Sequence, residues 1–326
     1  MSGACTAVAG TNIALVKYWG KRDAALNLPA TGSLSLTLAE LGTRTTVRFG
    51  GRGADRVRVG AADADQRFSF RVSQFLDIIR QQAGIGDAAE VTTENSVPTA
   101  AGLASSASGF AALALAASRA AGLSLTPTAL SGLARLGSGS AARSIFGGFV
   151  EMARGERPDG SDSVARALAD AWDLRLVVAM TATGEKALGS TAAMERTART
   201  SPFYPAWVAS SDADLADARA AIEVRDLDAL GRVAERSALR MHATALAADP
   251  AIVYWNGATL AAMQTVFHLR ASGVAAYVTI DAGPHVKALC AAADANRVAK
   301  ALGETSGVLR TVIASPGPGA RVVEDT

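Results

Sequence analysis

Cysteine is scarce in this chain of 326 residues, which contains only Cys5 and Cys290. Two cysteines are too few for a disulfide framework or a structural zinc site. Long apolar runs are missing too, since the stretches at residues 111–117 and 174–180 are too short to span a bilayer. The first residues lack a basic region followed by an apolar run, so we expect no secretory signal. These absences favour a cytoplasmic protein without a membrane partner.

An excess of charge of either sign is also absent. The chain has 32 Lys and Arg against 30 Asp and Glu, a formal net charge of +2, which gives no reason to expect nucleic acid or an anionic membrane as a partner. His242, His268 and His285 have no spacing that indicates zinc, so we expect no dedicated metal site in the protein itself. The composition, 49% hydrophobic and 19% charged, is typical of a compact protein of one or two domains.

The order of expected elements predicts an α+β fold, because helices and strands follow one another without a regular βαβ rhythm. A stretch with Gly and Ser at residues 183–191 separates the two expected domains, 1–183 and 184–326. Alternating patterns and short apolar runs predict strands at residues 4–15 (with a turn at 9–12), 32–38, 45–49, 56–59, 90–93, 149–152, 174–182, 275–280 and 307–314. Helical spacing predicts helices at residues 71–82, 110–118, from 126 to about 136, over most of 211–246, and at 254–271 and 286–301.

A run of hydroxyls leads from a loop into a helix at residues 95–109. The run contains Pro98, Gly102, Ser105, Ser106 and Ser108, and an Ala- and Leu-rich segment that readily forms a helix follows it. Free N–H groups and the positive end of the helix dipole make such a place an anion site. An ordinary serine N-cap is the alternative, but the combination favours a phosphate loop. No Lys follows the Gly, so this is not the G-x-x-x-x-G-K-[ST] loop.

Lys17 begins the densest polar and aromatic cluster of the chain, residues 17–23. The apolar run at residues 13–16 precedes it and would carry it to the edge of a core. A lysine delivered from a buried strand becomes reactive because desolvation disfavours its charged form. A solvated turn with an aromatic anchor is the alternative interpretation.

Two further segments carry chemistry. Ser138, Gly139 and Ser140 offer N–H groups and hydroxyls, and Arg143 adds a guanidinium fork that can grip a phosphate or carboxylate; a flexible Gly-Ser turn is the alternative. Asp281 follows an apolar strand, so we expect it at the floor of a cleft. Beside a lysine it can stay ionised and position a hydroxyl proton, unless it is only an N-cap or a structural ion pair.

These segments together resemble the diphosphomevalonate decarboxylase family of the GHMP small-molecule kinase superfamily. The resemblance rests on residues 12–23, 98–106, 137–143 and 281–284, in the family's order, and extends from about Ala4 to Gly319. The loop at 98–106 alone identifies only the superfamily, whereas the segments around Lys17 and Arg143 are specific to the decarboxylase. The resemblance implies a GHMP-kinase-like fold, with an N-terminal half like ribosomal protein S5 domain 2 and a ferredoxin-like C-terminal half around one deep cleft.

The resemblance also implies an activity: ATP-dependent decarboxylation of (R)-5-diphosphomevalonate to isopentenyl diphosphate, ADP, phosphate and CO2 in the mevalonate pathway of isoprenoid biosynthesis. It implies ATP and Mg²⁺ as cofactors and a homodimer as the assembly. The chemistry is consistent, because a tertiary alcohol is a poor leaving group until ATP phosphorylates it. Loss of CO2 then forms the alkene, and nearby cations stabilise the departing phosphate.

The family's site residues transfer motif by motif. The catalytic set is Asp281, which orients or deprotonates the C3 hydroxyl, Lys17, which holds the charge of Asp281, and Arg143. The expected substrate-binding residues are Tyr18, Trp19, Gly20, Lys21, Arg71, Ser138, Gly139, Ser140, Ala141, Ala142, Arg143, Ser190, Met194 and Thr200. The expected residues for ATP and Mg²⁺ are Asn95, Gly102, Leu103, Ala104, Ser105, Ser106 and Ser108.

Three alternative functions remain open from the sequence. A relative could act on 5-phosphomevalonate, or could stop after phosphorylating the C3 hydroxyl; the presence of both Asp281 and Lys17 argues against the second. A non-catalytic small-molecule sensor could use the same fold. A sensor has no need of Ser106, Asp281, Lys17 and Arg143 together, which argues against it.

Overall fold

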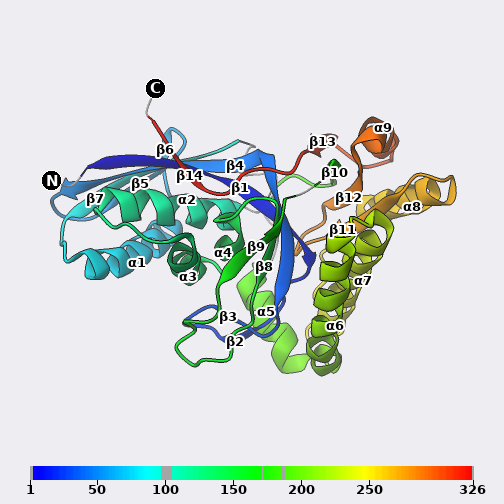
Figure 1. Cartoon of the computed structure of the whole chain (residues 1–326), viewed down its shortest axis with the longest axis horizontal. Helices are drawn as coiled ribbons and strands as arrows, with labels where there is room; N and C mark the ends of the chain where they lie inside the picture. Colours follow the sequence, from blue (N-terminus) through cyan, green and yellow to red (C-terminus); the bar gives the residue numbers. More distant parts are fainter. Residues whose placement is uncertain (1–2, 97–104, 171, 185–187, 325–326) are drawn as a thin grey trace.

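The computed structural model describes residues 3–96, 105–170, 172–184 and 188–324. Its elements form two main sheets with helices packed on them and a separate two-stranded sheet of β2 (Lys21–Asp23) and β3 (Leu28–Pro29) (Figure 1). The larger sheet has the strand order β14-β1-β4-β7-β5-β6, and β8 pairs with β4 and carries β9. Its strands are β1 (Ala4–Val16), β4 (Ser33–Gly51), β5 (Arg56–Val59), β6 (Ala62–Asp63), β7 (Ala88–Asn95), β8 (Phe149–Met152), β9 (Ala165–Ala169) and β14 (Arg321–Val323).

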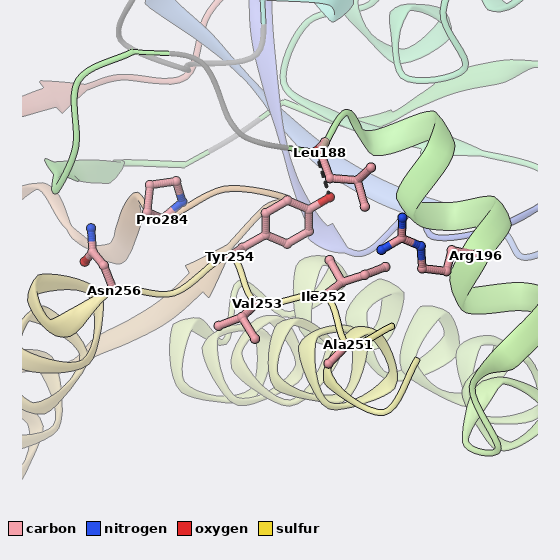
Figure 2. A pocket seen from close by; sticks show the side chains of 8 residues that line it. All are labelled: Leu188, Arg196, Ala251, Ile252, Val253, Tyr254, Asn256 and Pro284. Atoms are coloured by element: carbon pink, nitrogen blue, oxygen red, sulfur yellow. Dashed lines mark hydrogen bonds between the residues drawn. The ribbon is translucent and has the colours of Figure 1, made fainter. Parts of the chain in front are cut away.

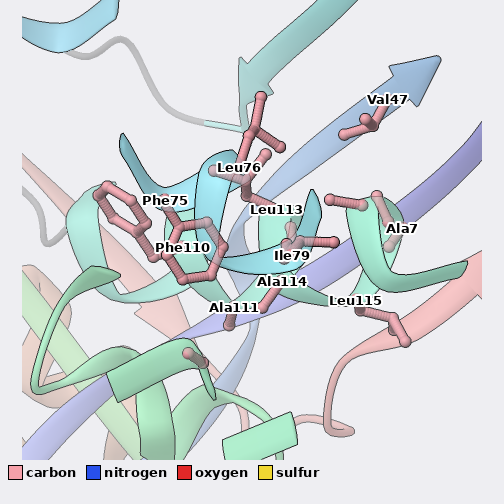
Figure 3. Close-up of a cluster of buried hydrophobic side chains, with 14 of the residues drawn as sticks. Ala7, Val47, Phe75, Leu76, Ile79, Phe110, Ala111, Leu113, Ala114 and Leu115 are labelled. Atoms are coloured by element: carbon pink, nitrogen blue, oxygen red, sulfur yellow. The ribbon is translucent and has the colours of Figure 1, made fainter. Parts of the chain in front are cut away.

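Three helices cover one face of this sheet: α1 (Gln66–Ala83), α2 (Ser105–Ala120) and α3 (Pro127–Gly137). Helix α2 lies directly on β1 and β4, because its small buried alanines allow a close approach of backbone to sheet. Figure 3 shows the resulting core, in which Leu76 of α1 and Leu113 of α2 meet Ala7 and Val47 of the strands. This packing holds the N-terminal end of α2 in place.

The smaller sheet is antiparallel, with the order β11-β12-β10-β13. In chain order this is a 4-1-3-2 arrangement, so the expected ferredoxin-like C-terminal half is confirmed. Its strands are β10 (Leu174–Met180), β11 (Ala276–Ile280), β12 (Val286–Ala291) and β13 (Arg310–Ala314). Helix α7 (Leu227–Leu246) packs on one face, while α8 (Gly257–Ala271) and α9 (Ala295–Gly303) pack on the other.

One apolar core joins the two sheets. It contains Leu15 of β1, Leu36 of β4 and Leu176 of β10, and it is closed by Leu215 of α6 (Tyr204–Glu223) and Leu230 of α7. Because this core is shared, the last residues of β1 are held against the C-terminal sheet. The division at residues 183 and 184 stays an expectation; β10, which precedes it, hydrogen-bonds with strands that follow it, and β14 pairs with β1.

Several sequence-based expectations were wrong in detail. The helix expected at residues 286–301 is a strand over its first six residues, β12, and α9 begins only at Ala295. Strand β12 is paired on both sides and buried on both faces, so it has no amphipathic alternation to distinguish it from a buried helix. The turn expected at residues 9–12 is instead an irregularity within the continuous strand β1.

Another error concerns the start of the helix expected at residues 254–271. Helix α8 begins at Gly257, because the Asn256 side chain accepts a hydrogen bond from the Thr259 N–H and the Thr259 hydroxyl accepts one from the Asn256 N–H. The strands expected at residues 32–38 and 45–49 are one continuous strand, β4, and the helical stretch expected over most of 211–246 is two helices, α6 (Tyr204–Glu223) and α7. The other expected strands and helices are present, with ends that differ by up to about five residues. Across the described residues, none of the helices combines the length and apolar character needed to cross a bilayer.

Candidate active site

Lys17 lies immediately after β1 and is almost fully buried. Its Nζ donates to the Ala14 carbonyl and to Asp281 Oδ1, both at 2.7 Å. Its backbone N–H donates to Ser237 Oγ of α7 at 3.0 Å. Burial lowers the pKa of Lys17 to about 8, although the charge of Asp281 opposes the shift. The expectation of a desolvated lysine at the end of a buried strand is therefore met by this position.

Asp281 follows β11 directly, and 32% of its side chain remains exposed. Its Oδ1 accepts from Lys17, and its Oδ2 accepts from Lys287 of β12 at 3.0 Å. Burial by itself would raise the pKa of Asp281, but the two ammonium groups outweigh it and hold that pKa well below its usual range. Asp281 is therefore a carboxylate at neutral pH, with one edge in reach of solvent.

Arg143 belongs to the short helix α4 (Ala141–Ser144) and is buried beneath the site. Its guanidinium donates to Asn12 Oδ1 at 3.2–3.3 Å, to Ser35 Oγ at 3.1 Å and to Ser33 Oγ at 2.5 Å. Asn12 in turn donates to the Ser140 carbonyl and to Ser144 Oγ, which anchors α4 on β1.

These partners of Arg143 are all neutral. Among the described residues no acidic side chain forms an ion pair with it. Burial lowers the pKa of Arg143 to about 10, so it is still charged at neutral pH. A buried cation without a bonded counter-ion is costly unless an anion binds beside it.

Tyr18 and the segment 138–140 lie against each other. A Cβ at Gly139 would collide with the ring and hydroxyl of Tyr18, so only glycine fits there. Ser138 Oγ and Ser140 Oγ lie 3.3 Å apart, which places two hydroxyls side by side at the end of α3. Ala141 and Ala142 are fully buried under them. The segment Ser138–Gly139–Ser140 is therefore a packed corner with a defined backbone and two hydroxyls, and this packing argues against a flexible Gly-Ser turn.

Trp19, Gly20 and Met194 are held by packing against neighbouring aromatic residues. Trp19 and Met194 are buried in one apolar cluster with Trp207, whose Nε1 donates to the Trp19 carbonyl at 3.0 Å. Gly20 has φ +107°, a conformation that favours glycine, and a Cβ there would collide with Tyr204. This packing fixes the backbone between Lys17 and Lys21.

Lys21 and Arg71 form a more exposed basic pair. Lys21 lies in the hairpin of β2 (Lys21–Asp23) and β3 (Leu28–Pro29), and its Nζ donates to Asn27 Oδ1 at 2.6 Å. Desolvation lowers the pKa of Lys21, and the nearby charge of Arg71 adds to the effect. Arg71 of α1 stacks over Phe110 at 5.1 Å. Because the charge of Arg71 acts on Lys21, the two cations lie near one another.

The helix α5 (Ser190–Thr200) carries two other expected residues. Ser190 is its first residue and is half-buried. Thr200 is its last, and its hydroxyl donates to the Arg196 carbonyl and accepts from the Asp249 N–H, both at 2.8 Å. The local bonds of Thr200 are those of a residue that ends a helix.

The expected phosphate loop is described only in part. Gly102, Leu103 and Ala104 lie outside the described residues, and of Ser105 only its place as the first residue of α2 is described. Ser106, in the first turn, is exposed. Ser108 is buried, and its Oγ lies 2.7 Å from Thr43 Oγ1 and 3.4 Å from Thr11 Oγ1.

Asn95 lies on the sheet side of the same loop, at the end of β7. Its Oδ1 accepts from Thr43 Oγ1 at 2.8 Å, so Asn95 and Ser108 share one hydroxyl partner. The loop therefore has an exposed hydroxyl at the helix N-terminus and a buried hydrogen-bond network that ties it to β4.

Two cavities of about 300 Å³ lie outside the group of Lys17, Arg143 and Asp281. Figure 2 shows one of them, between α5 and the segment 251–256, where Tyr254 Oη donates to the Leu188 carbonyl at 3.3 Å. The other is lined by β1, β4 and the end of β7, including Asn95. Neither surrounds the charged residues, which are packed directly on one another.

Lys287 was missed by the sequence-based reasoning. The signal was present, because the argument applied to Lys17, a lysine within an apolar strand, applies equally to Val286-Lys287-Ala288-Leu289. The expected helix at 286–301 concealed it, since a lysine on a helix face is unremarkable. Asn12, Ser33 and Ser35 were also missed as partners of Arg143, because hydroxyls in a strand carry no distinctive local pattern.

In the described part of the chain, no three or more His, Cys, Asp or Glu side chains are grouped so that they could hold a metal ion. The site instead combines three buried cations, Lys17, Lys287 and Arg143, with a single ionised carboxylate, Asp281. Such an excess of buried positive charge suits a substrate with several negative charges. A helix N-terminus with an exposed hydroxyl lies on α2, which suits a nucleotide phosphate.

This fold and this arrangement define the GHMP kinase class of small-molecule enzymes. Residues 9–165 match the family model described as the diphosphomevalonate decarboxylase-like N-terminal domain, and residues 176–314 match the mevalonate 5-diphosphate decarboxylase C-terminal domain. The chain belongs to the diphosphomevalonate decarboxylase family.

Curated relatives and solved structures agree with this membership. A diphosphomevalonate decarboxylase from Aspergillus fumigatus is 38% identical over 303 residues, 86% of this chain and 75% of the relative. The crystal structure of mevalonate diphosphate decarboxylase from Staphylococcus aureus superimposes with a TM-score of 0.94 at 38% identity, covering 98% of each chain. A neighbour in complex with MVAPP, AMPPCP and magnesium superimposes with a TM-score of 0.92 at 40% identity, covering 99% of each chain.

Proposed function

We propose that this protein catalyses the ATP-dependent decarboxylation of (R)-5-diphosphomevalonate to isopentenyl diphosphate, ADP, phosphate and CO2. The observation that carries the proposal is the Asp281 carboxylate, bonded to Lys17 at 2.7 Å within a buried group of cations. A hydroxyl must be oriented for phosphorylation, and a departing phosphate must be stabilised; this group has a residue type for each task.

Asp281 orients the C3 hydroxyl of the substrate in this proposal. Both of its oxygens accept bonds from ammonium groups, and its pKa is held low. A carboxylate of low pKa is a weak proton acceptor, so orientation of the hydroxyl is a better use of Asp281 than early removal of its proton. Lys17 keeps Asp281 ionised and adds positive charge where phosphate departs.

Arg143 and its surroundings bind the negative groups of the substrate. The guanidinium is held by Ser33, Ser35 and Asn12, so it is oriented before any anion arrives. Tyr18, Lys21 and the corner Ser138–Gly139–Ser140 are the further contacts proposed for the carboxylate and diphosphate. The buried residues among the remaining proposed substrate-side positions support the site through packing. These positions are Trp19, Gly20, Arg71, Ala141, Ala142, Ser190, Met194 and Thr200.

The N-terminus of α2 holds the ATP phosphates in this proposal, with Ser105 and Ser106 as hydroxyl ligands. Ser108 and Asn95 support the loop through Thr43 instead of facing the nucleotide directly. Mg²⁺ would come bound to the nucleotide and neutralise phosphate charge. Residues 102–104 stay in the proposal on the family resemblance alone.

A cytoplasmic homodimer with domains 1–183 and 184–326 is the proposed state of the protein, again on the family resemblance. Sedimentation at several protein concentrations tests the assembly. A single species of about the monomer mass, 33.2 kDa, would remove the dimer from the proposal.

Product analysis tests the activity itself. Purified protein with Mg-ATP is given mevalonate, its 5-phosphate or its 5-diphosphate, and ADP and CO2 are measured separately. We expect CO2 and ADP in equal amounts from the 5-diphosphate. CO2 from the 5-phosphate alone would assign the other substrate, and ADP without CO2 would show a kinase that stops after phosphorylation. Release of neither product from any of them would favour a sensor.

A further inference from the structure

Lys287 is a second lysine on the carboxylate of Asp281. It lies in β12, the strand paired with both β10 and β11, and its side chain is only 6% exposed. Its Nζ is 3.0 Å from Asp281 Oδ2, while Lys17 binds Oδ1. The carboxylate is therefore held at both oxygens, by one lysine that follows a strand of the larger sheet and one within the smaller sheet.

The register of the sheet explains how Lys287 reaches this position. Lys287 is opposite Thr279 of β11 and Val178 of β10, and paired residues project to the same face. Thr279 Oγ1 donates to the Ala14 carbonyl at 3.2 Å, the same carbonyl that accepts from Lys17. The face that carries Lys287 is therefore the face against the end of β1.

A purely structural ion pair does not account for Lys287. Lys17 already neutralises Asp281, so the second ammonium leaves this buried group with an excess of positive charge. Burying an ammonium group costs more than a structural pair returns, and an apolar residue of similar size would fill the strand at least as well. Apart from Lys287, the residues of β12 from Val286 to Cys290 are all apolar and fully buried. The reason for a lysine at this position is therefore its contact with Asp281.

We propose that Lys287 is a positioning residue for the reaction: it fixes the second oxygen of Asp281, so that the carboxylate meets the C3 hydroxyl of the substrate in one orientation. The proposal rests on the function proposed above for Asp281. With Oδ1 bound to Lys17 alone, the carboxylate could rotate about its last bond and present either oxygen edge. With both oxygens bound, the carboxylate cannot rotate, and only its solvent-exposed edge is left to contact the substrate hydroxyl.

Four elements place charged or titratable groups around Asp281. Lys17 follows β1, Lys287 comes from β12 and Arg143 from α4. His242 of α7 is buried, and burial, with the nearby charge of Lys17, lowers its pKa to about 3. His242 is therefore neutral in the working range, and the acid limb that depends on Asp281 lies below the usual range of a carboxylate in the wild-type protein.

The test compares Lys287→Met with wild-type protein, and Lys300→Met serves as the control because Lys300 is exposed on α9. CO2 release from the 5-diphosphate is measured from about pH 4 to pH 9, together with the KM for ATP and the thermal unfolding midpoint. We expect kcat to fall by about 10²-fold in Lys287→Met while the KM for ATP is unchanged. We also expect the acid limb of Lys287→Met to move up toward the measured range, since one ammonium group fewer stabilises the ionised carboxylate, while the Asp281-dependent activity of wild type persists to the lowest pH measured.

Several outcomes would overturn the proposal. A Lys287→Met protein with wild-type kcat and an unmoved acid limb would show that Lys287 has no part in the reaction. An equal loss of rate at every pH, with a lowered unfolding midpoint, would show a structural role only. If Lys287→Met does not fold, Lys287→Gln is measured by the same criteria. Wild-type protein that releases no CO2 would overturn the proposed function together with this inference, whereas an active wild type with an indifferent variant overturns the inference alone.

Discussion

Lys17 and Asp281 are 264 positions apart in the chain, yet the Lys17 Nζ lies 2.7 Å from Asp281 Oδ1. Lys17 follows the last residue of β1 in the larger sheet, and Asp281 follows the last residue of β11 in the smaller one. The pair therefore depends on how the two sheets pack through their shared apolar core.

Replacing the carboxylate tests its role directly. We expect Asp281→Asn to lower the rate of CO2 release by about 10³-fold, because the amide cannot offer a charged acceptor to the substrate hydroxyl. Binding of ATP, measured by calorimetry, should persist, since the N-terminus of α2 is on another element. Asp77→Asn is the matched control, because Asp77 is exposed on α1, far along the chain from Lys17 and Asp281, and forms an ion pair with Arg80. Near-normal turnover of Asp281→Asn would remove Asp281 from the proposed mechanism.

The pKa of Lys17 predicts opposite pH responses of activity and stability. Burial lowers that pKa from 10.5 to about 8, so activity should fall as pH rises through about 8 and the charge beside Asp281 is lost. Between about 8 and 10.5 the unfolded chain binds the proton that the folded protein has released. The contribution of Lys17 to stability therefore rises with pH in that window, by roughly 3 kcal/mol over the whole interval.

Two measurements check this prediction. The first is kcat/KM between about pH 6 and pH 10, where Lys17→Arg should carry the alkaline limb to higher pH because a guanidinium does not titrate there. The second is the difference in unfolding free energy between wild type and Lys17→Met as a function of pH. A difference that stays constant through this range would contradict the lowered pKa.

The contact between Gly139 and Tyr18 predicts a loss of activity from the addition of a single methyl group. In Gly139→Ala the new Cβ would collide with the Tyr18 ring, which must then move away from the corner formed by Ser138 and Ser140. We expect kcat/KM to fall by about 10–10²-fold, because a small displacement of a positioning group is expensive in rate.

Gly132→Ala is the matched control for that change. Its Cβ would lie 3.6 Å from Val164 Cγ1, an ordinary contact, and alanine should stabilise α3 by up to about 1 kcal/mol. The kinetics of both variants and their unfolding midpoints are compared. Unchanged kcat/KM in Gly139→Ala would mean that Tyr18 has no defined position in the reaction.

The two hydroxyls of α2 should separate into one that acts on the nucleotide and one that stabilises the loop. Ser106 is exposed, so Ser106→Ala should weaken the use of ATP without changing the unfolding midpoint. Ser108 is buried against Thr43 and Thr11, so Ser108→Ala should lower the free energy of unfolding by about 1–2 kcal/mol. Steady-state kinetics with ATP varied and urea unfolding measure the two effects; an exchange of roles between the serines would contradict the prediction.

The sequence alone predicted most elements of the fold because their patterns are local. The strand at residues 56–59 and the helix from residue 126 follow from alternation, capping and a proline at the first helical position. Strand β12 could not be separated from a helix, since it is buried on both faces. The continuous β1 was divided by an expected turn, because the Gly10 that indicates a turn serves here for close approach to the Leu38 carbonyl.

For the site, local sequence motifs were enough to propose Lys17, Arg143 and Asp281, because each stands in a segment with a distinctive local sequence, and the structure brings Lys17 and Asp281 into contact. The difference between Ser106 and Ser108 was not readable, since exposure depends on what packs over each turn of α2. Lys287 was not readable either, because it lies within a strand that the pattern assigned to a helix.

The sequence by itself determined which chemical groups this protein has and the family to which it belongs, because residue identity and spacing carry both. Only the tertiary structure decided that Lys17 and Lys287 meet on one carboxylate and that Arg143 is buried among neutral oxygens. Those relationships come from the register of β12 and from the packing of two sheets on a common core. Contacts between residues far apart in the chain depend on such packing, which no local pattern encodes.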